Sequence, residues 1–459
     1  MPHRFDPTIL REYDIRGIVG KTLSVADARA IGRAYAVTLL AAGGRRAAVG
    51  YDGRLTSPEL ERALVDGLAS EGVDVLRIGR GPTPMLYFAA ATRNVDGGIM
   101  VTGSHNPPEY NGFKLTLQGK PFYGDAIRRL GDTALRLGIA ERPRGRVRDE
   151  AVREDYVARL AADYRGARPL SVAWDVGNGA TGEVVQQLVV RLPGRHILLN
   201  ETIDGRFPAH HPDPTLPENL VQLQAAVAQQ RCDLGIAFDG DGDRIGIVDE
   251  HGQIMWGDQL MIVLARDVLA RRPGATIIAD VKASQVLFDE IARMGGRPEM
   301  AATGHSLIKA KLAETGAPLA GEMSGHIFYA DGYYGFDDAV YVAVRLLDIL
   351  ARTEESLAAM RERMPAVVNT PELRFPCGEA RKFEVVREVR DRLRQAGAEI
   401  GDIDGVRVKS GDGWWLLRAS NTQDVLVARA EAVSEADLSR LKRELAAQLS
   451  ASGVALPDS

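Results

Sequence analysis

Cysteine is scarce in this sequence, and its scarcity limits the kinds of site that the chain can build. Only two cysteines, Cys232 and Cys377, occur among 459 residues, and they stand far apart. Neither lies in a spacing typical of metal ligands, so we predict no cysteine metal site. We expect both to be ordinary buried thiols in a protein of the reducing cytoplasm.

A strong charge of either sign is also missing. The 57 basic and 62 acidic residues leave a net charge of only −5. No basic excess indicates a nucleic-acid footprint, so we expect no nucleic-acid partner. Any anion must instead be bound by a few focused groups.

Long apolar runs are absent as well. No stretch is long enough to span a bilayer, and the opening MPHRFDPTILREYDIRG lacks the apolar segment of a secretory signal. We therefore expect a cytoplasmic protein with no membrane partner.

What the sequence does contain is a repeated alternation of helix and strand patterns. A helix capping box at 24–27 opens a helix, and 47–49 follows as a strand. This βαβ rhythm predicts a mostly parallel sheet flanked by helices. The rhythm restarts at 170–174, after a charged, proline-containing stretch at 141–146 that suits a linker, and again after His251-Gly252.

The last part of the chain has a different pattern. After Pro376, short strands at 406–408, 414–417 and 425–427 follow a helix at about 383–395, and Ser434 opens a final helix. Consecutive strands between helices indicate an antiparallel α+β module. At roughly 100–200 residues per domain the length allows three or four domains. We predict four: 1–149, 150–252, 253–366 and 367–459.

Glycine-rich polar loops follow three of the predicted strands. Residues 99–101 lead into TGSHNP, 235–238 into DGDGDR, and 318–320 into GEMSGH. In α/β sheets, ligands bind outside the carboxyl ends of strands. We therefore expect the three loops to converge on one central cleft.

The loop DGDGDR is the most informative of them. Its carboxylates, Asp239, Asp241 and Asp243, repel one another unless a cation neutralises them, and the glycines between them allow a tight turn. Oxygen ligands favour a hard ion, and Mg²⁺ is the usual partner of phosphate chemistry. An EF-hand is excluded because its sixth position, which requires glycine, is Arg244.

Three further groups of polar residues fix no role on their own. Ser104 in TGSHNP lacks the flanking glycines of a hydrolase nucleophile elbow, which disfavours acyl transfer. The carboxylate, hydroxyl and imidazole of GEMSGH suit the hydroxyls of a sugar, and RASNT at 418–422 suits a phosphate dianion. A plain polar turn remains the alternative for each.

Together these loops resemble those of the α-D-phosphohexomutase superfamily, and most closely its phosphomannomutase/phosphoglucomutase branch. The motifs YDIRG, TGSHNP, NGFK, DGDGDR, TGHS, GEMSGH and RASNT occur in family order over essentially the whole chain. The resemblance implies three related mixed-sheet α/β domains and a C-terminal α+β domain around a central cleft. It also implies an isomerase that moves a phosphoryl group between C1 and C6 of mannose or glucose.

The resemblance assigns roles to individual residues. Ser104 would carry the phosphoryl group, and Mg²⁺ would be held by Asp239, Asp241, Asp243 and a phosphoserine oxygen of Ser104. Other catalytic positions would be Arg16, Lys114, Arg244 and His305. The substrate would be bound by Tyr13, Lys282, Glu322, Ser324, His326, Arg418, Ser420, Asn421 and Thr422.

We expect a reaction in three stages. The phosphoserine donates to the sugar monophosphate, the resulting hexose 1,6-bisphosphate reorients, and its other phosphate returns to Ser104. The bisphosphate thereby serves as intermediate and activator. Lys114 is the first candidate for the base, because a lysine in a cationic, desolvated cleft loses its proton more easily, and His305 is the second.

Other functions remain open at this point. The D-x-D pattern of 239–241 resembles that of aspartate-nucleophile phosphatases, although Asp243 replaces their usual threonine or valine, so a metal-dependent sugar-phosphate phosphatase is one alternative. A non-catalytic sugar-phosphate binder would not need both Ser104 and the three aspartates. Met323 favours the mannose/glucose branch, since phosphoglucosamine mutases, the alternative within the family, tend to have glutamine there.

Overall fold

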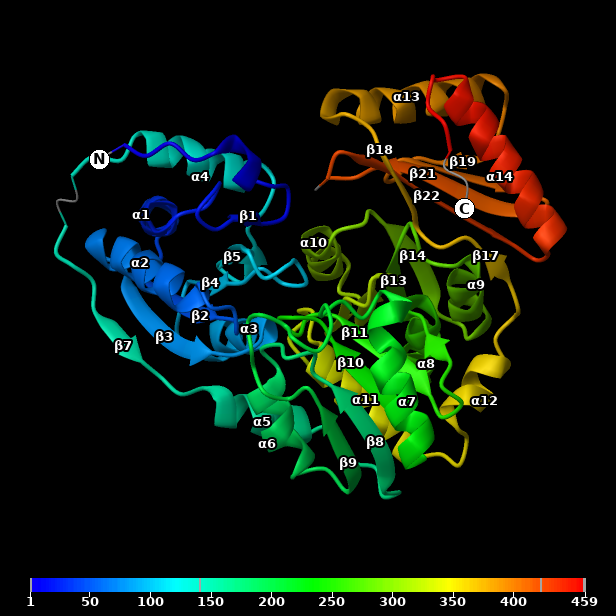
Figure 1. Cartoon of the computed structure of the whole chain (residues 1–459), viewed down its shortest axis with the longest axis horizontal. Coiled ribbons are helices and arrows are strands. Elements are labelled where there is room, and N and C mark those ends of the chain that lie inside the picture. The colour runs from blue at the N-terminus through cyan, green and yellow to red at the C-terminus, as the bar shows by residue number, and fades with distance from the viewer. Residues whose placement is uncertain (1, 140–141, 422, 457–459) are drawn as a thin grey trace.

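The computed structural model describes residues 2–139, 142–421 and 423–456, and its strands form four sheets in order along the chain. In Figure 1 the first domain, in blue and cyan, lies on the left, and the fourth, in orange and red, lies at the upper right above the third. Among the described residues, no helix has both the length and the apolar character that a membrane span requires.

The first domain contains a seven-stranded mixed sheet in the order β1-β5-β4-β2-β3-β7, with β6 paired to β5. Its strands are β1 (Ile15–Ile18), β2 (Arg46–Tyr51), β3 (Asp74–Arg80), β4 (Gly97–Val101), β5 (Tyr110–Leu117), β6 (Lys120–Pro121) and β7 (Val147–Asp149). Its helices are η1 (Pro7–Ile9), α1 (Val25–Ala41), α2 (Ser57–Ser70), α3 (Thr83–Thr92) and α4 (Asp125–Leu135). The predicted capping box is confirmed, because Ser24 and Asp27 bond each other's backbone at the start of α1.

The predicted linker is partly built into this domain. Glu141 lies outside the described residues, and 142–146 carry neither helix nor strand. The chain then forms β7, which pairs in parallel with β3. It thus follows the outer edge of the first sheet before it enters the second domain (Figure 1).

The second domain has a five-stranded sheet in the order β12-β11-β10-β8-β9. Its strands are β8 (Leu170–Asp175), β9 (Gly194–Leu199), β10 (Leu234–Phe238), β11 (Ile245–Asp249) and β12 (Ile254–Met255), and its helices are α5 (Arg153–Ala161), α6 (Gly182–Val189), η2 (Pro217–Leu220) and α7 (Val221–Gln230). The parallel strands β9, β8 and β10 are extended by the antiparallel β11 and β12, so the sheet is mixed as predicted.

The third domain repeats the plan with a four-stranded sheet in the order β14-β13-β15-β16. Its strands are β13 (Thr276–Asp280), β14 (Arg297–Ala301), β15 (Leu319–Gly321) and β16 (Ile327–Tyr329), and its helices are α8 (Gly257–Arg271), α9 (Gln285–Arg293), α10 (His305–Thr315), α11 (Ala339–Ala351) and α12 (Leu357–Glu362). One apolar core joins this domain to the two before it, since Phe88, Trp174 and Leu346 belong to the same buried cluster.

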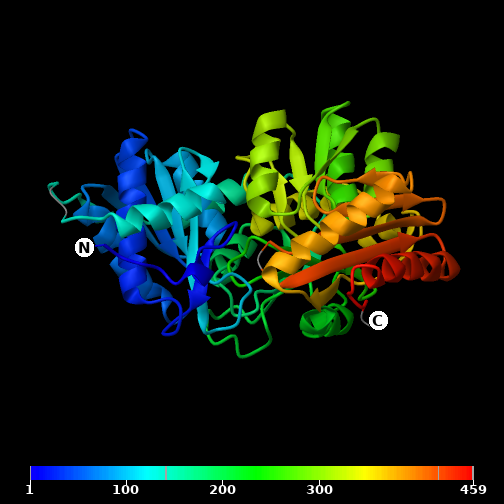
Figure 2. The same cartoon turned by 90° about the horizontal axis from the view of Figure 1, so that it is seen from above.

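The fourth domain is the predicted antiparallel α+β module. Its six strands are β17 (Val368–Asn369), β18 (Leu373–Pro376), β19 (Ile400–Gly401), β20 (Val406–Ser410), β21 (Gly413–Ala419) and β22 (Val425–Ala432), packed on α13 (Glu379–Gln395) and α14 (Glu435–Ser450). Because side chains alternate along a strand, Trp415 joins the core under the helices whereas Trp414 packs on Val281 of the third domain. Figure 2 accordingly shows the third and fourth domains together on one side and the first on the other.

Candidate active site

The three predicted loops each follow a buried strand. TGSHNP follows β4, DGDGDR follows β10, and GEMSGH begins at the end of β15. The acidic loop contacts the first domain twice: the N–H of Thr83, at the start of α3, donates to the Asp241 carbonyl oxygen at 2.8 Å, and the Thr102 hydroxyl of TGSHNP lies 3.2 Å from Oδ2 of Asp241. The Ile245 N–H after the acidic loop donates to the Gly325 carbonyl oxygen at 3.1 Å, which brings in the third.

The Ser104 hydroxyl faces the acidic loop. Its Oγ lies 3.1 Å from Oδ2 of Asp239 and 3.3 Å from Nδ1 of His105. The side chain of Thr102 accepts the Ser104 N–H at 2.8 Å, and the serine has φ of 50°. A non-glycine residue rarely adopts this left-handed conformation, so the loop must hold the serine there. The predicted proximity of serine and aspartates is confirmed.

The acidic loop places three carboxylates at one point. Asp239, Asp241 and Asp243 are fully buried, and one oxygen from each lies within 4.8 Å of the others. The Asp239 Oδ1 accepts the backbone N–H groups of residues 242, 243 and 244 at 2.9, 3.1 and 3.2 Å. Gly242 has φ of +75°, and a Cβ there would lie 2.3 Å from a methyl group of Thr181, so only glycine fits this turn.

These aspartates suit a divalent cation. Within the described part of the chain, Oδ1 of Asp241 and Oδ1 of Asp243 are buried without a hydrogen-bond partner. Burial raises the pKa of Asp239 well above its usual value, and the charges of Asp241 and Asp243 raise it further. A hard cation would satisfy the unpaired oxygens and relieve the repulsion, and an all-oxygen ligand set fits Mg²⁺.

Lys114 lies on β5 with its ammonium group between two of these carboxylates. Its Nζ donates to Oδ2 of Asp241 at 2.8 Å and to Oδ2 of Asp243. Burial disfavours the charged form, but the two carboxylates outweigh burial and raise the pKa of Lys114 above its usual value. The predicted cationic surroundings of this lysine are therefore wrong: the groups nearest to it are acidic.

Two arginines lie near the serine: burial lowers the pKa of the adjacent His105, and the charges of Arg244 and Arg16 lower it further. Arg244 follows the last aspartate, and its Nε donates to Nε2 of His326 at 2.9 Å. Arg16, on β1, forms an ion pair with Asp14. Guanidinium groups in such positions can bind phosphoryl oxygens.

The sugar-loop residues are anchored from several elements. Oε1 of Glu322 accepts the Gly304 N–H at 2.6 Å, and burial raises the pKa of Glu322. Ser324 is half-buried. Nδ1 of His326 lies 3.1 Å from Oδ2 of Asp337, and Lys282 pairs with Glu372 of the fourth domain at 2.9 Å.

His305 opens α10 beside His326. The two rings stack with their centroids 5.4 Å apart, and Nδ1 of His305 lies 3.7 Å from Oδ2 of Asp337. Burial lowers the pKa of His305 well below its usual value, and the neighbouring Lys309 lowers it further. The imidazole is therefore neutral near pH 7.

The RASNT loop reaches back to the first domain. The Nδ2 group of Asn421 donates to the Tyr13 hydroxyl at 2.6 Å, and that hydroxyl donates to the Thr303 carbonyl oxygen at 2.8 Å. Nε of Arg418 bonds Asp404 at 2.9 Å, and Oγ of Ser420 accepts the Gln423 N–H at 3.2 Å. Thr422 lies outside the described residues. Tyr13 thus joins three domains.

Other residues of the site are absent from our predictions. Oγ1 of Thr83 donates to Asp241 at 2.5 Å, and Asp337 contacts both histidines. Lys309 Nζ donates to Asp337 at 2.8 Å and thereby lowers the pKa of Asp337 despite its burial. The paired acids Asp337-Asp338, after an aromatic run, could have indicated this part of the site; Thr83 has no such signal.

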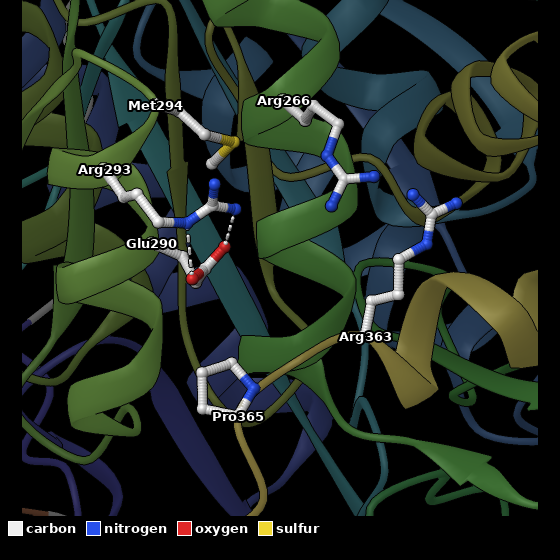
Figure 3. Close-up of a pocket in the computed structure, with 6 residues that line it drawn as sticks. All are labelled: Arg266, Glu290, Arg293, Met294, Arg363 and Pro365. Carbon is white, nitrogen blue, oxygen red and sulfur yellow. Dashed lines mark hydrogen bonds and ion pairs between the residues drawn. The ribbon is translucent and has the colours of Figure 1, made fainter.

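A separate hollow lies on the third domain. It has a volume of about 600 Å³ and is lined by Arg266, Glu290, Arg293, Met294, Arg363 and Pro365. Figure 3 shows the Arg293–Glu290 pair on one side and the Arg266 and Arg363 guanidinium groups on the other. No predicted site residue is among these six, so this hollow is not part of the site above.

Comparison with known proteins gives consistent matches along the chain. The models for phosphoglucomutase/phosphomannomutase α/β/α domains I, II and III match residues 7–136, 154–252 and 256–367, and the model for the C-terminal domain matches 372–448.

Two relatives and one solved structure illustrate the similarity. The chain is 44% identical to a phosphomannomutase/phosphoglucomutase of Pseudomonas putida over 98% of this chain and 97% of that one. It is 42% identical to a phosphoglucomutase of Neisseria gonorrhoeae over 96% of each. A phosphoglucomutase/phosphomannomutase family protein of Burkholderia thailandensis has a structure that matches with a TM-score of 0.94 at 44% identity, covering 99% of this chain and 100% of that one.

Proposed function

This chain belongs to the phosphoglucomutase/phosphomannomutase family and interconverts hexose 1-phosphates and hexose 6-phosphates, and we propose that Ser104 carries the phosphoryl group between the two positions. One observation carries the proposal: the Ser104 hydroxyl lies 3.1 Å from the buried Asp239 carboxylate. A nucleophile beside a cation-binding group is what phosphoryl transfer requires. We propose mannose and glucose phosphates as the substrates, in line with the names of the relatives.

Asp239, Asp241 and Asp243 are proposed to hold Mg²⁺, together with an oxygen of phosphorylated Ser104. The ion would neutralise charge on the transferring phosphoryl group. Arg244 and Arg16 are proposed to bind the oxygens of the same group from the protein side.

The substrate is proposed to lie between the sugar loop and RASNT. Glu322, Ser324 and His326 would bond the sugar hydroxyls, with Lys282 beside them. The phosphate that does not react would be held by Arg418, Ser420, Asn421 and Thr422, with Tyr13 nearby. The pairs Arg418–Asp404 and Lys282–Glu372 support this assignment, because they hold each cation in place before an anion arrives.

The proposed reaction has two transfers and one reorientation. The phosphorus–oxygen bond to Ser104 breaks as one forms to the free sugar hydroxyl, which gives hexose 1,6-bisphosphate. The bisphosphate turns around, and its other phosphate returns to Ser104 as the reverse transfer. His305 and Lys114 are the two candidates for the base that takes the hydroxyl proton, and the neutral imidazole supports His305.

The proposal also includes the domain boundaries and the location of the protein in the cell. The division into domains 1–149, 150–252, 253–366 and 367–459 is supported by the four family models, since each matches a stretch inside one of these domains, apart from residue 367 at the end of the third match. A cytoplasmic location is supported by Cys232 and Cys377, which are both buried free thiols.

The test is to incubate the protein with Mg²⁺ and glucose 1,6-bisphosphate and to measure Ser104 phosphorylation by intact mass and peptide mapping. We expect one phosphoryl group on Ser104 that survives hydroxylamine, as a serine ester does and an acyl phosphate does not. Ser104→Ala should lose both the label and the mutase activity. Ser324→Ala, the matched control, should keep the label while binding the sugar more weakly.

A label that remains in Ser104→Ala, or that hydroxylamine removes, would contradict the proposal and favour an aspartyl phosphatase. A parallel assay with mannose, glucose and glucosamine 1-phosphates tests the substrates. A strong preference for the amino sugar would overturn our assignment.

A further inference from the structure

A fully buried arginine, Arg54, contacts the serine loop, which comprises residues 102–110. Arg54 follows β2, and its side chain has an exposed fraction of 0%. Burying a guanidinium group is costly unless each of its donors finds an acceptor. The partners of Arg54 therefore indicate what this burial achieves.

The two terminal nitrogens of Arg54 bond four carbonyl oxygens of the serine loop. Nη2 donates to the oxygens of Ser104 at 2.7 Å and Asn106 at 2.5 Å. Nη1 donates to those of Pro107 at 2.6 Å and Tyr110 at 3.0 Å. The backbone of residues 104–110 is thus wrapped around one planar group.

The same carboxylate contacts both Arg54 and the start of the loop. Oδ2 of Asp52 lies 3.2 Å from Nε of Arg54 and accepts the Thr102 hydroxyl at 2.8 Å. It also accepts the Gly103 N–H at 3.2 Å. A Cβ at Gly103 would lie 2.4 Å from Nε, so the loop approaches the guanidinium as closely as glycine permits.

The second domain covers the other side of Arg54. The Phe207 ring centroid lies 5.1 Å from the guanidinium carbon. A Cβ at Gly205 would lie 2.5 Å from the Arg54 Cα, so this segment also packs tightly. The guanidinium is therefore held between two domains and cannot leave the loop without disturbing both.

We infer that Arg54 is a positioning residue for phosphoryl transfer, which fixes the left-handed backbone of Ser104 so that its hydroxyl faces the acidic loop. The inference rests on the proposed function of Ser104. The φ of 50° needs external support, and Arg54 supplies it through the Ser104 carbonyl oxygen itself. A lysine has one donor nitrogen and cannot reproduce this planar fork, so the exchange is not conservative here.

The test is Arg54→Lys, with kcat and KM measured for conversion of glucose 1-phosphate in the presence of Mg²⁺ and glucose 1,6-bisphosphate. We expect kcat to fall by about 100-fold, because a misplacement of about 1 Å has that effect on a reacting group. KM should change by less than about threefold, because the residues proposed to bind the sugar and its phosphate come from other loops. Ser104 phosphorylation by the bisphosphate should slow by the same factor as kcat.

Arg33→Lys is the matched control. Arg33 is also a buried arginine of the first domain, and it donates to Glu71 and to the Gly138 carbonyl oxygen, both at 2.7 Å. We expect its kcat to stay within about twofold of the wild-type value, even if its thermal midpoint falls. A kcat of Arg54→Lys within about threefold of wild type, or an equal loss in Arg33→Lys, would overturn the inference.

Phe207→Leu keeps the test decisive if Arg54→Lys does not fold. This variant removes the ring that packs on the guanidinium and so frees the guanidinium to shift away from the carbonyl oxygens of the serine loop. We expect kcat to fall by about fivefold, and an unchanged kcat would overturn the inference. Ser104→Ala separates the two proposals, since activity in that variant contradicts the role of Ser104, whereas an inactive Ser104→Ala with a normal Arg54→Lys contradicts only the role of Arg54.

Discussion

Replacing Tyr13 with phenylalanine should weaken catalysis by loosening the junction of three domains. The change removes one oxygen atom, which donates to the Thr303 carbonyl oxygen at 2.8 Å and accepts from Asn421 at 2.6 Å. Each bond contributes about 1 kcal/mol net, so their joint loss is about 2 kcal/mol. At about 1.4 kcal/mol per factor of ten, kcat/KM should fall by about 10- to 30-fold.

The measurement is steady-state conversion of glucose 1-phosphate, with Tyr35→Phe as the control. Tyr35 is buried in the first domain and its hydroxyl donates to the Thr116 carbonyl oxygen, away from the fourth domain. Its loss should lower stability by about 1 kcal/mol and leave kcat/KM within about twofold. Our reasoning fails if Tyr13→Phe retains the wild-type kcat/KM, or if both variants lose activity equally.

Three other predictions concern the metal, pH and the sugar loop. Mg²⁺ at 100 times its Kd should raise the free energy of unfolding by about 2.7 kcal/mol in thermal unfolding. Asp241→Asn should lose this stabilisation, and a variant that Mg²⁺ stabilises as much as the wild type would contradict the proposed metal site. Asp175 raises the pKa of His210 above 6.5, so the stability from this pair is complete below pH 6.5 and lost as pH rises through the folded pKa. The urea midpoint should therefore fall as the pH rises above about 6.5, and it should fall less in Asp175→Asn. Gly325 has φ of +86°, and a Cβ there would lie 2.5 Å from a backbone oxygen of β11, so Gly325→Ala should lower the free energy of unfolding by more than about 1 kcal/mol and reduce activity. Gly332 also has positive φ, but a Cβ there would meet no atom within 4 Å, so Gly332→Ala should retain activity.

Short sequence motifs predicted where helices begin, because a helix cap depends only on residues within one turn of it. Ser24 and Ser434 each accept the backbone N–H three residues later and begin a helix where expected. The strand–loop pattern placed Ser104 and Asp239 at the carboxyl ends of β4 and β10, where ligands bind in α/β sheets, and the packing of the two separate sheets brings these ends together. Two boundaries of the fourth domain differed by four residues or more: α13 begins at Glu379, before the expected start near Phe383, because Gly378 serves as its N-cap, and β22 extends to Ala432, beyond the expected end at Val427.

The surroundings of individual side chains could not be predicted in the same way. The residues next to Lys114 give no indication of acidic neighbours, yet Asp241, which bonds it, lies 127 positions away. Thr83 and Asp337 likewise reach the site only through contacts with distant elements. Tertiary packing sets the electrostatics of each group, whereas a short motif fixes only the residue types that are present.

The distribution of apolar cores has a consequence for how the molecule denatures. One cluster joins the first three domains through Phe88, Trp174 and Leu346, beside a second cluster inside the first domain around Val49, whereas the fourth has its own cluster around Trp415. A calorimetric scan should therefore resolve fewer transitions than there are sheets, with the C-terminal module melting as a separate cooperative unit. Selection for stability then acts on the first three domains jointly, and a cavity made in any one of them weakens the framework that carries both Ser104 and the aspartates.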